Sequence, residues 1–195
     1  MEQLLTLIIS LIMSLTVSGG VSNAAEVPPE EAAKAFLDGI KAYDEQVVDS
    51  YMDNKYVNFL ENADGEPKDT KKMQEAILGG MEYEILDSIQ KNRTAVVKVR
   101  VSNKDFSNVM PAYEKASYDY VMEHLYDENI SDKDYLNDKC VSIYVKQLEK
   151  TASKGKTVEK EIFIPMEDDG YYGWRIVLDD GIMKSLMGNF KLPVK

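Results

Sequence analysis

The sequence contains one cysteine and one histidine, Cys140 and His124, in 195 residues. A single cysteine excludes an internal disulfide framework, and one residue of each kind argues against a metal site built from several His and Cys ligands. We therefore expect neither a metal nor a cofactor. Basic residues are also scarce, since 23 Lys and Arg stand against 34 Asp and Glu and leave a net charge of −11. Because affinity for phosphate comes from clustered Lys and Arg, we expect no binding to nucleic acid.

The composition is that of a globular protein, with 44% hydrophobic and 29% charged residues. The chain shows no internal repeat, no low-complexity tract and no linker long enough to separate two domains. Its length fits one ordinary domain and a short extra segment. We predict that residues 26–195 form a single domain and that residues 1–25 are the extra segment.

Residues 1–25 have the features of an export signal. The run from Leu4 to Val17 is almost wholly apolar, too short to span a bilayer comfortably, and is followed by small residues. Ser22-Asn23-Ala24 is an acceptable cleavage site. The usual positive charge before the apolar run is missing, which indicates either an atypical signal or a start further upstream. A buried helix of the mature domain is the alternative interpretation.

Val17-Ser18-Gly19 resembles the start of a bacterial lipobox, but the position of the lipid-bearing cysteine is occupied by Gly20. The chain as written therefore cannot carry that lipid. We expect an extracytoplasmic protein, secreted or associated with the cell surface, that contacts a membrane only through the N-terminal segment if this is not cleaved.

The mature chain begins with a helical pattern. Pro28-Pro29 precedes apolar residues at i, i+3, i+4 and i+7, which predicts a first helix. Asp44 is suited to cap a second short helix. A third is predicted from Asp69 to the pair Gly79-Gly80.

Two segment pairs alternate with period 2 and predict antiparallel hairpins: residues 83–89 with 95–101, and residues 158–166 with 174–178. We expect Tyr83, Ile85, Asp87 and Ile89 to share one face. A helical pattern separates the hairpins, with a capping box at Ser131-Asp132-Lys133-Asp134, and a short helix ends the chain. The prediction is an α+β fold, in which a curved antiparallel sheet of about four strands packs against N-terminal helices and a helical insertion lies between two hairpins.

Four segments resemble nuclear-transport-factor-2-like (cystatin-like cone) domains, and more specifically exported lipoproteins of unknown function from Gram-positive bacteria. They are PPEEAAKAFLDGIKAYDEQVVDSYM, EYEIL, TAVVKVRVSNKD and GYYGWRIVLDDGIMKSLMG. The resemblance implies a cone made by an apolar helix and a curved sheet, with Trp174 beginning the last strand and a short helix after it. It implies little about activity, because this superfamily includes enzymes, binding modules and assembly adaptors.

Tyr113, Tyr120 and His124 are the candidate ligand-binding residues. We expect them to share one side of a helix with Ser117 and Leu125, and the inserted helices hold many of the twelve tyrosines. Aromatic rings with a polar tip suit a ligand pocket or a protein interface. The alternatives are a structural histidine held by hydrogen bonds and a half-buried helix surface.

Asp87 is the candidate catalytic residue, because it interrupts an apolar strand pattern, as Lys160 does in a later strand. A carboxyl group inside an apolar pocket can transfer protons near neutral pH. The alternative is a position at the solvated rim of the sheet. Glu167 to Gly170 are interpreted as a β-turn and not a calcium loop, and Cys140 as a buried small hydrophobe.

The hypothesis that follows is an exported, non-enzymatic domain that binds an unknown small molecule or an envelope protein. Two alternatives stay open. One is a small enzyme of the isomerase or dehydratase type that uses Asp87 with a tyrosine hydroxyl, and the other is an adaptor in an envelope or secretion assembly.

Overall fold

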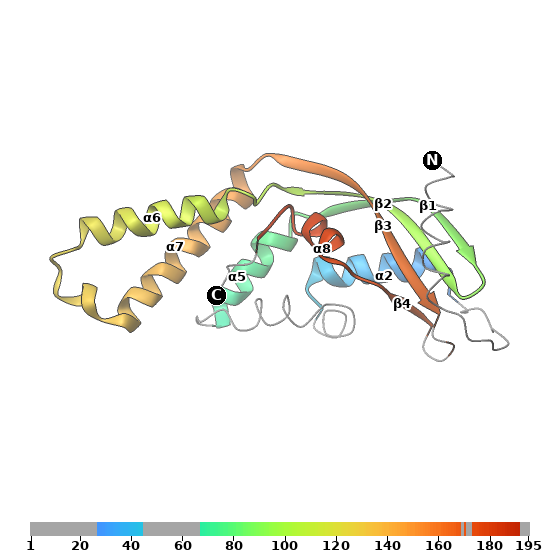
Figure 1. Cartoon of the computed structure of the whole chain (residues 1–195), viewed down its shortest axis with the longest axis horizontal. Helices are drawn as coiled ribbons and strands as arrows, with labels where there is room; N and C mark the ends of the chain where they lie inside the picture. The colour runs from blue at the N-terminus through green and yellow to red at the C-terminus, as the bar shows by residue number, and fades with distance from the viewer. Residues whose placement is uncertain (1–26, 45–66, 169, 171–172, 192–195) are drawn as a thin grey trace. The chain divides into compact units, whose positions relative to one another are not determined.

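The computed structural model describes residues 27–44, 67–168, 170 and 173–191 (Figure 1). The predicted export segment and the predicted second helix lie outside the described residues. Contacts divide the described chain into two compact units, each assembled from separate stretches of sequence. The first unit takes its described residues from 1–52, 83–101 and 159–183, and the second from 53–82, 102–158 and 184–195.

The fold is α+β, as predicted, with the insertion between the two strand pairs. Four strands form one antiparallel sheet in the order β1-β2-β3-β4. The elements in chain order are α2 (Pro29–Ala42), α5 (Pro67–Leu78), β1 (Glu82–Lys91), β2 (Thr94–Lys104), α6 (Val109–Glu123), η1 (Glu128–Ser131), α7 (Lys133–Lys154), β3 (Thr157–Asp168), β4 (Trp174–Ile176) and α8 (Asp180–Leu186).

Helix α2 covers one face of the sheet in the first unit. Pro29 begins the helix and Glu30 and Glu31 lie in its first turn, where negative charge favours the positive end of the helix dipole. Its apolar stripe is buried, with Ala33, Phe36, Leu37 and Ile40 at most 1% exposed. The facing strands supply Ala95, Val97, Val99, Ile164 and Met166, all fully buried. Burial of this stripe explains why α2 is stable as a helix.

Strand β1 does not keep one alternation along its length. The hydroxyl of Tyr83 donates to the carboxylate of Asp38 at 2.6 Å, and the hydroxyl of Ser88 donates to the carboxylate of Glu30. Both side chains therefore reach α2, although they are an odd number of residues apart. Side chains on one face of a regular strand are an even number apart, so the alternation is interrupted between them, as at a β-bulge.

This interruption decides where Asp87 lies. Its side chain is exposed, and its carboxylate accepts a hydrogen bond from the Ser88 N–H at 2.9 Å. The prediction that Asp87 shares the apolar face with Tyr83 and Ile85 is therefore wrong. Lys160 on β3 is exposed as well.

In the second unit, α7 packs against α5, α6 and η1. Its inner face buries Tyr144, Val145 and Leu148. Asp132 caps the helix, because its carboxylate accepts hydrogen bonds from the backbone N–H groups of Asp134 and Tyr135. The capping box was therefore predicted one residue too early, since Ser131 belongs to η1.

Asn103 joins three parts of the second unit. It is 1% exposed, and its amide nitrogen donates to the backbone oxygens of Ile77 at 2.9 Å and Leu186 at 2.8 Å. Its side-chain oxygen accepts from the Lys104 N–H at 2.7 Å. The ends of α5 and α8 thus obtain partners for carbonyl groups that a helix leaves without intrahelical bonds.

The last elements follow the prediction closely. Trp174 begins β4, which pairs antiparallel with β3 through the register Met166 to Ile176. The closing helix α8 and the residues after it bury Ile182, Met183, Leu186 and Met187. Within the described ranges, no helix combines the length and apolar character needed to cross a membrane.

Candidate functional site

The α6–α7 pair holds most of the candidate residues. The side of α6 that carries Tyr113 and Tyr120 faces α7. The Tyr113 ring meets the Tyr144 ring edge-on at a centroid distance of 5.3 Å. The hydroxyls of Tyr120 and Tyr135 are 3.1 Å apart. These tyrosines therefore form part of the contact between the two helices.

His124 lies directly after α6 and closes this side of it. Its ring stacks on Tyr120 with centroids 4.1 Å apart, and its Nδ1 lies 2.8 Å from the Tyr120 backbone oxygen. Tyr113 and Tyr120 thus share one side of α6, as predicted, whereas His124 stacks on Tyr120 from the position just after the helix. Their role in binding a ligand stays a prediction, since each of them contacts another residue of the α6–α7 pair.

The phenol groups in this contact hold their protons tightly. The hydrogen bond to Tyr135 is the main cause that raises the pKa of Tyr120 to about 12. Burial is the main cause that raises the pKa of Tyr113 and of Tyr144 above the usual tyrosine range. The Tyr144 hydroxyl is buried, and no described residue gives it a hydrogen bond. All three phenols are therefore neutral near neutral pH, which suits packing between helices.

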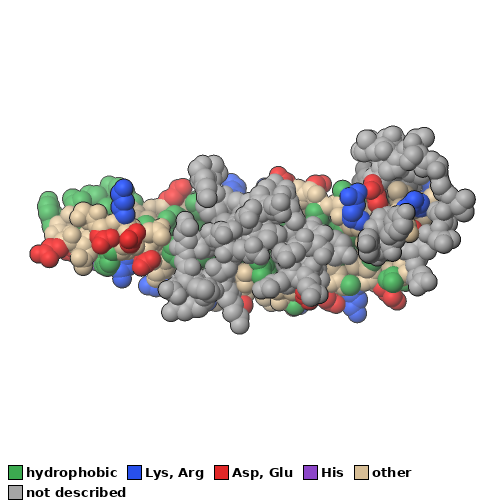
Figure 2. All heavy atoms as spheres, turned by 90° about the horizontal axis from the view of Figure 1, so that it is seen from below, with side chains coloured by type: hydrophobic (Ala, Val, Ile, Leu, Met, Phe, Trp, Pro, Cys, Tyr) green, Lys and Arg blue, Asp and Glu red, His purple; other side chains and the backbone are tan. Residues whose placement is uncertain are grey.

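The opposite side of α6 and the residues just after the helix carry large apolar side chains that the described structure leaves exposed. Tyr118 is 65% exposed, Met122 52%, Leu125 47% and Tyr126 96%. We call these four residues the apolar patch. Figure 2 shows hydrophobic side chains gathered with acidic ones at the left-hand end of the molecule, where the α6–α7 connection lies.

The patch was only partly predictable. The sequence indicates that the inserted helices hold many of the twelve tyrosines, but it does not show which of these rings are exposed. Met122 was missed, and Leu125 was predicted on the inner side with His124. That prediction is wrong, because α6 ends at Glu123 and the residues after it no longer follow the helical period.

The surroundings of the patch are acidic. Between Glu114 and Lys139 the sequence has eight acidic residues and three lysines. Lys115 is paired with Asp119 at 2.6 Å, and the ammonium of Lys139 lies 5.2 Å from the centre of the Tyr135 ring. Two of the three lysines are thus already engaged within the helix pair.

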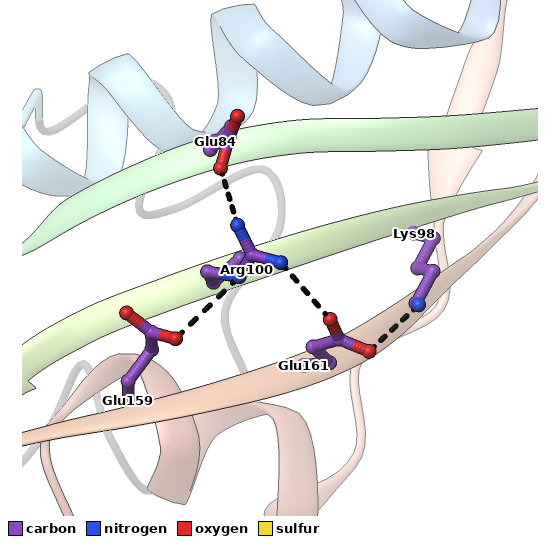
Figure 3. Close-up of polar contacts among 5 residues, drawn as sticks. All are labelled: Glu84, Lys98, Arg100, Glu159 and Glu161. Carbon is purple, nitrogen blue, oxygen red and sulfur yellow. Dashed lines mark hydrogen bonds and ion pairs between the residues drawn. The ribbon is translucent and has the colours of Figure 1, made fainter.

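A second charged cluster lies on the strands of the first unit (Figure 3). Arg100 on β2 contacts Glu84 of β1 at 2.7 Å, and on β3 it contacts Glu161 at 3.3 Å and Glu159 at 3.5 Å. Glu161 also pairs with Lys98 at 2.6 Å, a contact that lowers its pKa. The cluster cross-links three neighbouring strands, so we assign it a structural role.

The other candidates have contacts typical of structural residues, and Cys140 interacts with the Tyr113 hydroxyl across the α6–α7 contact. Asp87 is exposed and lies in no apolar pocket. Cys140 is half-buried on α7. At the end of β3, the Asp168 carboxylate accepts a hydrogen bond from the Gly170 N–H at 2.8 Å, an arrangement that belongs to a turn. Among the described residues, no group of three or more His, Cys, Asp and Glu is placed to hold a metal ion.

Comparisons with known proteins do not show a family. No family model and no curated protein matches the chain. Among solved structures, the chain is similar to a Bacillus subtilis protein described as a "putative lipoprotein (ycdA)", with 16% identity and a TM-score of 0.45. The alignment covers 93% of this chain and 54% of that protein, so the chain spans about half of its length. At this TM-score the similarity establishes neither family nor function. The resemblance to nuclear-transport-factor-2-like domains and exported lipoproteins stays a prediction.

Proposed function

We propose that the protein is an exported, non-enzymatic binding module that holds an envelope protein against the apolar patch. The observation that carries this proposal is the exposure of Tyr118, Met122, Leu125 and Tyr126 within nine consecutive residues. Single exposed apolar residues are common on soluble proteins, whereas contiguous groups mark interaction sites. Tyrosine and methionine are also enriched at protein interfaces.

The helix pair that presents the patch is held internally, which favours binding without large rearrangement. The tyrosine contacts described above fix α6 on α7, and the Asp132 cap fixes the start of α7. A surface that is ordered before binding loses less conformational entropy when its partner arrives. The alternative of a small enzyme receives no support from Asp87, which is exposed.

Site-specific photo-crosslinking in cells that naturally make the protein tests the proposal. A benzophenone amino acid replaces Tyr118 or Tyr126 in the full chain, and Glu149, an exposed residue of α7, as the control position. We expect one discrete adduct from the two patch positions and none from the control. Mass spectrometry identifies the adduct, and binding of the purified partner to the purified chain then confirms it.

A patch variant completes the design. Met122→Asp introduces a charge into the patch at an exposed position of α6, so it should abolish the adduct while the far-ultraviolet circular dichroism stays unchanged. Adducts that form equally at the control position, or that survive Met122→Asp, contradict the proposal.

A further inference from the structure

We infer that the partner of the apolar patch presents apolar side chains surrounded by lysine and arginine, and that the acidic residues around the patch select it. This inference rests on the proposed function and adds the chemical class of the partner. It is carried by the charge distribution around the patch, which differs from that of a neutral protein surface.

The net charge around the patch is negative. Between Glu114 and Lys139, eight acidic residues stand against three lysines, so five acidic residues remain in excess after every lysine in the segment is counted. Glu123 and Asp127, both exposed, lie beside Met122 and Tyr126 in the sequence. The C-terminal end of α6 adds the negative end of a helix dipole at the same place. A partner that covers the patch therefore meets a surface that carries more negative than positive charge.

This acidic rim disfavours the other occupants. A second copy of the chain would bring an identical acidic rim against this one, and like charges placed together across an interface are costly. An anionic membrane surface is repelled for the same reason, since such surfaces attract basic segments. A basic protein is steered toward the patch, and its cationic rim is neutralised on docking.

Reversal of the rim charges tests the inference. Glu123→Lys with Asp127→Lys reverses two charges beside the patch and leaves all four patch residues in place. Glu82→Lys with Glu149→Lys makes the same change in net charge at exposed positions elsewhere in the second unit. We expect the rim variant to lower the yield of the adduct from Tyr118 by about fivefold or more, and the control variant to leave it within about twofold.

The outcomes separate the inference from the proposed function. An adduct that survives rim reversal but is lost in Met122→Asp overturns the basic partner and leaves the binding patch standing. The absence of any adduct at the patch positions overturns both. With the identified partner purified, we expect its Kd to rise about tenfold between about 0.05 M and 0.3 M NaCl, because salt screens exposed charges.

Two further measurements address the alternative occupants with defined probes. Sedimentation velocity of the mature chain that shows a dimer lost in Met122→Asp overturns the inference in favour of a second copy. Co-sedimentation with vesicles of pure phosphatidylcholine, or of phosphatidylcholine with phosphatidylglycerol, overturns it in favour of a lipid surface if Met122→Asp removes the binding. We expect a monomer and no vesicle binding.

Discussion

The indole N–H of Trp174 donates a hydrogen bond to the backbone oxygen of Val27, 2.8 Å away. The two residues are 147 positions apart and belong to the same unit. Val27 lies immediately before the prolines that begin α2, and Trp174 is the first residue of β4. The contact therefore fixes the residue before α2 to β4, an edge strand of the sheet. Because Trp174 is 6% exposed, the ring also contributes buried apolar area.

Trp174→Phe removes the donor but keeps an aromatic ring at the start of β4. The Val27 oxygen then loses its partner, and the smaller ring fills less of the site. We expect the free energy of unfolding to fall by about 1–2 kcal/mol, measured by urea denaturation followed by circular dichroism. Tyr118→Phe, a change on an exposed ring, serves as the control and should stay within about 0.5 kcal/mol. An unchanged midpoint for Trp174→Phe would show that this contact does not stabilise the fold.

Asn103 is predicted to be intolerant even of an isosteric change. Asn103→Asp places a carboxylate oxygen against the backbone oxygens of Ile77 and Leu186, which removes two hydrogen bonds and buries a charge. We expect a loss of about 3 kcal/mol or more at neutral pH. Asn103→Leu, which removes the polar group without adding charge, should cost less, about 2 kcal/mol. If both variants unfold at the parental urea concentration, the assigned hydrogen bonds do not hold α5 and α8 in solution.

Elements with long apolar periodicity could be predicted from the sequence, because one repeating pattern determines them. The stripe of α2 and the alternation of β2 belong to this class. Features that depend on a single local irregularity, such as a strand interruption or a helix end, could not be predicted. Asp87 is exposed because the alternation of β1 is interrupted before it. Leu125 does not follow the helical period because α6 ends at Glu123. The role of Asn103 was invisible for another reason, since its partners are backbone carbonyls far away in the sequence.

Two carboxylates with a lowered pKa, Glu161 in the cluster around Arg100 and Glu30 on α2, predict that the fold loses stability in acid. The hydrogen bond from Lys98 lowers the pKa of Glu161 below its ordinary value of 4.5, and the hydrogen bond from Ser88 does the same for Glu30. Carboxylates with a lowered folded-state pKa stabilise the fold fully above the unfolded value, and this contribution is lost as the pH falls through the folded value. The loss should therefore begin near pH 5 and continue below about pH 4.

Glu161→Gln tests this assignment, because a glutamine cannot titrate. Urea midpoints measured from about pH 7 down to pH 3 should fall less steeply in this variant than in the parent. Glu149→Gln, which removes an exposed carboxylate of α7 with no assigned ion pair, is the matched control and should keep the parental slope. If the urea midpoint of Glu161→Gln falls with pH as steeply as that of the parent, the ion pair between Glu161 and Lys98 does not cause the acid sensitivity.

In the α6–α7 contact, replacing tyrosine by phenylalanine should change the stability of the fold in opposite directions at two positions. Tyr144→Phe removes a buried hydroxyl that forms no hydrogen bond with any described residue, so stability should stay equal or rise by up to about 1 kcal/mol. Tyr135→Phe removes the partner of the Tyr120 hydroxyl and should lower stability by about 0.5–1.5 kcal/mol. Thermal unfolding followed at 222 nm measures both. A clear loss in Tyr144→Phe would indicate a bound water or ligand at this hydroxyl.

Substitutions at Gly188 and Gly173 distinguish the cost of backbone strain from the cost of a steric clash. Both have positive φ, at 58° and 97°, a region that side chains disfavour. A Cβ on Gly188 would lie 1.8 Å from the Lys104 backbone oxygen, whereas a Cβ on Gly173 would meet no atom of the described residues within 4 Å. Gly188 also accepts a hydrogen bond from the Phe106 N–H at 2.7 Å, so the backbone cannot move away without losing it.

Gly173→Ala should therefore cost only the strain of its backbone, about 1–2 kcal/mol. Gly188→Ala adds a clash with a backbone atom and should cost about 3 kcal/mol or more, with loss of the Phe106 hydrogen bond. Urea denaturation gives both values, and hydrogen exchange of the Phe106 amide gives an independent readout, because its protection should fall in Gly188→Ala and stay unchanged in Gly173→Ala. Equal costs for the two substitutions would mean that the segment after α8 does not pack against Lys104 and Phe106 in solution.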